Sequence, residues 1–109
     1  MPTAYKVLGQ SAPSATTDTT LYTVPASTSA VVSTISVCNR DTGSGTFRIA
    51  IRPAGASLAN QHYVVYDAAL AANATATFTL GVTLATTDVV TVRASTANFS
   101  FSAFGSEIS

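Results

Sequence analysis

The stretch that decides the fold is VVSTISVCNRDTGSGTFRIAIRPAG, residues 31–55. It holds two apolar segments separated by a polar turn that contains two glycines. In the second segment, Phe47 and Ile49 alternate with Arg48, and Arg52 continues the outward series. A period of two is typical of a β-strand that buries one face and exposes the other. Because glycine accepts positive φ at turns, we predict that the two segments form a central hairpin.

The same alternation continues outward along nearly the whole chain, and helix signals are almost absent. Only the short segment SLANQ suggests a helical turn. The strands expected from this pattern cover residues 5–8, 20–24, 30–38, 46–52, 63–66, 74–80, 89–93 and 99–104. About eight short strands predict an all-β fold, a single antiparallel β-sandwich of the jelly-roll type over residues 1–109. The Ser-, Thr- and Pro-rich start predicts a partly extended N-terminal arm over residues 1–20.

The last predicted strand shows which side chains should face the core. Phe99 and Phe101 share one face, and Phe104 falls on the other. An aromatic residue on an outward face near the end of a strand is a candidate for contact with another subunit.

The charge content is low. The chain is 47% hydrophobic and 9% charged, with a formal net charge of zero, whereas average proteins have about 25% charged residues. A neutral chain lacks the basic surface that nucleic acids or anionic membranes require, so we expect neither as a partner. A surface without self-repulsion favours association, so we expect a homo-oligomer.

Recognisable catalytic machinery is missing from the sequence. Cys38 is the only cysteine and His62 the only histidine, so neither a disulfide nor a histidine-rich metal site can form within one chain. Cys38 fits either a small buried hydrophobe or a thiol activated by Arg40, and the former is favoured. We expect no catalytic residue, cofactor or metal; an enzyme would have to gather its groups from separate strands or subunits. We also expect a protein made in the cytoplasm, because the start MPTAYKVLGQ lacks a signal-peptide pattern.

Two groups of side chains are candidates for contacts. In QHYVVYD, Tyr63 and Tyr66 are candidate ligand contacts, with core or interface packing as the alternative. On the outward face of the central strand, Arg48 and Arg52 fit either solvated positions or pairs with acids of a neighbouring subunit.

Three longer stretches resemble small structural proteins of tailed-bacteriophage particles. They are KVLGQSAPSATTDTTLYTVPASTSAVVSTISVCNR, TFRIAIRPAGASLANQHYVVYD and TLGVTLATTDVVTVRAS. Together they cover nearly the whole chain, and their shared features are patterns of strands and turns with no catalytic signature.

The resemblance implies a non-enzymatic virion protein, most simply a capsid decoration (cement) protein that stabilises the head by binding its surface as an oligomer, often a trimer. Its partners would be copies of itself and the major capsid protein or other virion proteins. The alternative is a neck or tail fibre component that binds a receptor or glycan. The expected contacts between subunits or with the lattice are Tyr5, Lys6, Arg48, Arg52 and Phe104.

Overall fold

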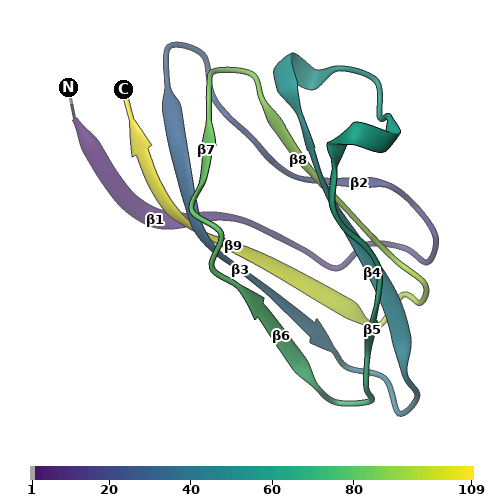
Figure 1. Cartoon of the computed structure of the whole chain (residues 1–109). Coiled ribbons are helices and arrows are strands. Elements are labelled where there is room, and N and C mark those ends of the chain that lie inside the picture. The colour runs from purple at the N-terminus through teal and green to yellow at the C-terminus, as the bar shows by residue number, and fades with distance from the viewer. Residues whose placement is uncertain (1) are drawn as a thin grey trace.

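The computed structural model describes residues 2–109. In this part of the chain nine strands and two single 3₁₀ turns follow one another (Figure 1). The strands are β1 (Thr3–Ser11), β2 (Thr19–Thr23), β3 (Ser29–Asn39), β4 (Gly45–Arg52), β5 (Tyr63–Leu70), β6 (Thr75–Phe78), β7 (Val82–Leu84), β8 (Val89–Ala94) and β9 (Phe99–Ile108). The turns are η1 (Pro53–Gly55) and η2 (Asn60–His62), and the second overlaps the segment in which a helical turn was expected.

Two antiparallel sheets form a sandwich, which confirms the predicted fold class. One sheet, called sheet A, has the order β1-β9-β3-β6, with β7 also paired to β3; sheet B has the order β2-β8-β4-β5. The chain therefore pairs from its ends inward: β1 with β9, β2 with β8, β3 with β6 and β7, and β4 with β5. This is the strand order of a jelly roll, in which β6 and β7 together occupy one strand position.

The predicted central hairpin is wrong. β3 belongs to sheet A and β4 to sheet B, so the turn between them carries the chain from one sheet to the other. Asn39, buried at the end of β3, holds this crossover: its Nδ2 donates to the carbonyl oxygens of Gly43, Leu70 and Ala71 at 3.0–3.2 Å. The alternation was read correctly, because Val37 and Ile49 are both fully buried. Val37 of sheet A and Ile49 of sheet B point toward each other across the core, whereas the strands of a hairpin would lie side by side in one sheet.

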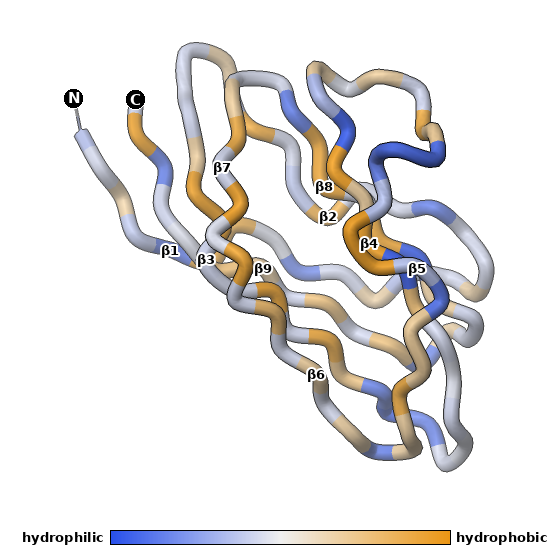
Figure 2. Tube along the Cα trace, viewed as in Figure 1, coloured by the Kyte–Doolittle hydropathy of each residue, from blue (hydrophilic) through white to orange (hydrophobic). Residues whose placement is uncertain are grey.

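The core lies between the two sheets, where the hydrophobic colour collects on β4 and β8 and alternates along β3 and β9 (Figure 2). Phe47 of sheet B is its aromatic centre. Its ring centroid lies 5.8 Å from that of Phe78, 6.1 Å from that of Phe99 and 6.2 Å from that of Phe101. These separations suit edge-to-face and tilted contacts, which add to the hydrophobic stabilisation. The predicted inward faces of β4 and β9 are thereby confirmed.

Residues 2–20 are more fully built into the domain than the predicted arm would be; Met1, the first residue of that prediction, lies outside the described residues. Residues 3–11 form β1, which pairs with β9 from Thr3↔Ile108 to Ser11↔Phe101. Only residues 12–18 form a loop, and Pro13 is buried. The pairing with β9 accounts for most of this, and Leu8 is the residue of β1 that packs against the core. The outer ends of β1 and β9 consequently lie side by side (Figure 1), and the Ser109 N–H donates to the Pro2 carbonyl at 3.1 Å.

Sheet A bends where two irregularities flank β9. The register of β1 shifts at Leu8, and that of β3 shifts at Ser33. A bulge bends its strand and increases the local twist. Beyond the bend, the outward face of sheet A carries Phe104 and the first residues of β1.

No helix in residues 2–109 is both long enough and apolar enough to span a membrane.

Candidate functional site

The outward face of sheet B carries a cluster centred on Arg48. Because Phe47 and Ile49 point into the core, the side chain between them points outward. Its Nε donates to Asp67 Oδ1 at 2.6 Å and its Nη2 to Asp67 Oδ2 at 3.2 Å. Two parallel bonds of this kind fix the orientation of the guanidinium as well as its charge.

A bulge in β5 makes this pairing possible. Phe47 pairs with Ala68 and Ile49 with Val65, so two residues of β5, Tyr66 and Asp67, stand opposite the single Arg48. Asp67 has a φ of 49°, in the left-handed region. A non-glycine residue in a sparsely populated backbone region costs about 1–3 kcal/mol. The strained backbone turns the Asp67 carboxylate toward the guanidinium.

The two predicted ligand tyrosines join the same cluster. The rings of Tyr63 and Tyr66 form an edge-to-face pair with centroids 4.8 Å apart. The Arg48 guanidinium lies 4.2 Å from the ring centroid of Tyr66 and 5.9 Å from that of Tyr63. Tyr66 nevertheless remains 58% exposed. The result is an exposed aromatic surface that a cation–π contact holds in place.

The electrostatics of the cluster favour the charged forms of both Arg48 and Asp67. The hydrogen bonds from Arg48 lower the pKa of the Asp67 carboxyl below its ordinary value. The same contact raises the pKa of Arg48. A general acid or base needs a pKa near the working pH. The lowered pKa of Asp67 and the raised pKa of Arg48 both lie further from neutral pH than the ordinary values. This pair is suited to positioning and recognition.

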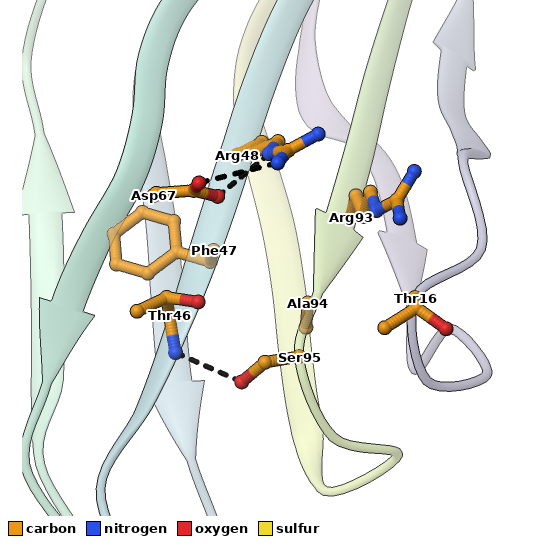
Figure 3. Close-up of a pocket in the computed structure, with 8 residues that line it drawn as sticks. All are labelled: Thr16, Thr46, Phe47, Arg48, Asp67, Arg93, Ala94 and Ser95. Atoms are coloured by element: carbon orange, nitrogen blue, oxygen red, sulfur yellow. Dashed lines mark hydrogen bonds and ion pairs between the residues drawn. The ribbon is translucent and has the colours of Figure 1, made fainter.

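A pocket of about 180 Å³ lies beside this cluster, over β4 and β8 (Figure 3). Its lining residues are Thr16, Thr46, Phe47, Arg48, Asp67, Arg93, Ala94 and Ser95. Arg93 is the direct cross-strand partner of Arg48. Sequence reasoning found neither Asp67 nor Arg93 as site residues, and only the position of Asp67 next to Tyr66 gave a signal.

Arg52, the other predicted contact on β4, is engaged inside its own chain. Its Nε donates to the Ala56 carbonyl at 2.7 Å, its Nη2 to the Gly55 carbonyl at 3.0 Å and its Nη1 to Thr91 Oγ1 at 3.3 Å. The side chain therefore fastens the turn after β4, away from the tyrosine cluster.

A second candidate surface lies on the outward face of sheet A. It is a groove of about 410 Å³ lined by Tyr5, Lys6, Val31, Ser33, Phe104, Gly105 and Ser106. Here the structure brings together the predicted contacts Tyr5 and Phe104, which come from opposite ends of the chain. Tyr5 is 86% exposed, Phe104 37% and the neighbouring Val7 49%. We call Tyr5, Val7 and Phe104 the sheet A apolar patch.

Lys6, the remaining predicted contact, already has a partner within the chain. Its Nζ lies 2.8 Å from Glu107 Oε1, and the Tyr22 hydroxyl donates to Glu107 Oε2 at 2.5 Å. The hydrogen bonds from Lys6 and Tyr22 lower the pKa of Glu107. Burial, reinforced by Glu107, raises the pKa of Tyr22. This network ties β1 and β9 to β2.

The two residues with reactive side chains have different surroundings from each other. His62 is buried, and its Nδ1 accepts the backbone N–H of Ala59 at 3.0 Å, a contact within the η2 turn. Cys38 is half-buried beside Val37, which points into the core, so the thiol lies on the other face of the sheet. The expected burial of Cys38 in the core is therefore wrong. Across residues 2–109, no group of three or more His, Cys, Asp or Glu side chains is placed to hold a metal ion.

Comparisons with protein-family models, with curated proteins and with solved structures found no match to this chain.

Proposed function

We propose that the protein is a non-enzymatic structural component of a tailed-phage particle, namely a decoration (cement) protein that binds the head as a homo-oligomer. The observation that carries the proposal is the sheet A apolar patch. A chain with so few charges also carries little repulsion to oppose close packing against a neighbour. Jelly rolls are common in viral capsid domains, which agrees with the proposal at the level of fold analogy.

The patch is large enough to matter energetically. Burying a large apolar side chain stabilises an assembly by about 1.5–3 kcal/mol before the costs of association. Tyr5 and Phe104 are the anchors, because aromatic side chains dominate the energetics of interfaces. Repeated on each subunit, such contacts stabilise a capsid by mass action, since the protein binds only the assembled lattice.

The test measures the mass of the purified protein by light scattering and then its binding to phage heads stripped of minor proteins. We expect a discrete oligomer, a trimer, that binds the heads in many copies and raises their melting temperature. Tyr5→Ser combined with Phe104→Ser should abolish binding. The matched control is Val64→Ser, which removes an exposed apolar side chain, 47% exposed, from sheet B. A monomer, or an oligomer that ignores heads, contradicts the proposal.

The cluster on sheet B favours a second candidate function, a neck or tail fibre component that binds a receptor glycan. Tyr66 offers an exposed ring, held in place by Arg48, as a surface for a sugar. Binding on a glycan array that Tyr66→Ala abolishes and Tyr5→Ala leaves intact would support it. Tyr5 is the matched control because it is an exposed tyrosine on the opposite sheet. Arrays without any binding would count against this function.

A further inference from the structure

We infer that the outward face of sheet A lies against the particle over its whole length, and that the shell surface opposite it is uncharged. This contact rests on the proposed function, because it begins at the sheet A apolar patch. It extends that function in three respects, namely the full area of the contact, the chemistry of the partner surface and the side of the subunit that stays in solvent.

The charged side chains are divided unequally between the two sheets. The chain has five basic and five acidic residues, and in residues 2–109 the strands of sheet A include only Lys6 and Glu107 among them. These two form an ion pair, and the Glu107 carboxylate also accepts the hydroxyl of Tyr22 in sheet B. The pair is therefore neutral and lies on the side of sheet A that faces sheet B.

The rest of the charge lies in sheet B or in loops. The residues concerned are Asp18, Arg40, Asp41, Arg48, Arg52, Asp67, Asp88 and Arg93. A solvated surface commonly has about 25–35% charged residues, whereas the core of an interface is depleted of them. The outward face of sheet A thus has the composition of a covered surface, and sheet B has that of a solvated one.

Small polar side chains cover the outward face of sheet A beside the apolar patch. Because the strands pair in register, these side chains stand in two rows across neighbouring strands, which we call the sheet A polar rows. One row is Gln10, Ser102, Ser36 and Thr77, and the other is Ser100, Cys38 and Thr75. Their neighbours Val37 and Phe101 are buried, which places the rows outward. Ser102 and Phe104 are successive outward residues of β9, so the rows and the patch are continuous.

The patch is too small to hold a subunit on its own. A whole aromatic side chain offers about 200 Å², so Tyr5 at 86% exposure and Phe104 at 37% provide about 250 Å² together. A standard stable interface buries about 800 Å² on each partner. Four strands about 4.8 Å apart, with the ten residues of β9 at about 3.3 Å each, cover about 600 Å² before the relief of the side chains is added. The polar rows therefore supply the area that the patch lacks.

The polar rows also decide the chemistry of the partner surface. A charged side chain set against an uncharged face would lose its water and gain no opposite charge, which is unfavourable. Hydroxyl groups that become covered need hydrogen-bond partners. The shell surface should therefore offer uncharged polar groups opposite the rows and an apolar hollow for Tyr5. Sheet B, with its charges, then faces the solvent.

Cys38 reports directly on this contact, because it lies in the polar rows and is the only cysteine of the chain. Its thiol is half-buried, so a small reagent such as iodoacetamide is used, on free protein and on protein bound to stripped heads. Labelling on heads should be slower by about tenfold or more, because the thiol then reacts only after the subunit dissociates. The matched control is Thr20→Cys with Cys38→Ser, an exposed position on β2 of sheet B. It should label at the same rate in both states.

Thr77→Asp tests the polar rows away from the patch. It places a short charged side chain at an exposed position of β6, and it should weaken head binding by about tenfold or more, the loss expected for a charge covered without a partner. Thr20→Asp, the matched control in sheet B, should bind within about twofold of the wild type. Wild-type binding should also change by less than about twofold between about 0.05 and 1 M salt, since no charge pair crosses the contact. The labelling of Cys38 uses the wild-type chain and does not depend on how Thr77→Asp folds.

Several results would overturn the inference. If bound protein labels at the rate of free protein, or if both aspartate variants bind alike, only the patch touches the shell and the proposed function stands. If Cys38 labelling slows as the free protein is concentrated, a second copy covers this face. Binding that weakens steeply with salt contradicts an uncharged partner surface. If the wild type does not bind heads at all, the proposed function fails, and this contact fails with it.

Discussion

Substituting Gly105 tests whether the bend in sheet A depends on the close approach of the β9 backbone to that of β3. A β-carbon added at this position would lie 1.9 Å from the Val31 carbonyl oxygen, 2.9 Å from its carbonyl carbon and 3.1 Å from the Val32 Cα. All three are backbone atoms of β3, so no side chain can rotate away. The Gly105→Ala substitution must therefore push two paired strands apart.

The required movement can be worked out from these distances. Close carbon–oxygen contacts between strands are about 3.3–3.6 Å, so β9 and β3 must separate by roughly 1.4 Å. β9 is held on its other side by β1, which leaves little room to move. Overpacking costs about 1–3 kcal/mol, and sometimes more. We expect a loss at the upper end, about 3 kcal/mol, which lowers the melting temperature by about 12 °C or more for a domain of this size.

The assay is urea unfolding followed by circular dichroism and by tyrosine fluorescence, since the chain has no tryptophan. The matched control is Gly43→Ala, because a β-carbon there meets no atom within 4 Å. Gly43→Ala should be neutral or stabilise by less than about 1 kcal/mol, through the entropy of the unfolded chain. If Gly105→Ala and Gly43→Ala unfold at the same urea concentration, the close approach of β9 to β3 does not constrain the fold.

Three further predictions concern contacts inside the chain. Asn39→Ala should cost about 2–3 kcal/mol in urea unfolding, because it leaves buried carbonyl groups without a donor; the exposed Asn60→Ala should be nearly neutral. Glu107 has a lowered pKa in the folded state, so the stability it contributes is present above its unfolded pKa of about 4.3 and is lost as the pH falls through the folded value. The advantage of the wild type over Glu107→Gln should therefore shrink on acidification, and a constant difference would refute this. Arg52→Lys should cost about 1 kcal/mol and speed proteolysis in residues 53–59, since lysine cannot replace the paired bonds of the guanidinium; unchanged cleavage would count against this role.

The sequence predicted several of the residues that form the two candidate sites. The alternation in β4 and β9 correctly placed Arg48 and Phe104 outward, and Tyr63 and Tyr66 were recognised as surface candidates. Their partners were not, because Asp67 meets Arg48 only through a bulge in β5. A bulge changes the face of the residues that follow it and leaves no fixed mark in the sequence.

The sequence by itself determined the class of fold and the face of most side chains. Both follow from the period of two, a local property of each strand. Only the tertiary structure decided which strands are neighbours: β3 and β4 lie in opposite sheets, β1 joins β9, and Arg48 meets Arg93. The physical reason is that the facing sheet buries the apolar face of a strand whichever strand is paired at its edge, so the alternation does not identify the neighbour. The choice depends on the fit of distant segments, such as the bonds of Asn39 and the aromatic contacts of Phe47, which no local pattern records.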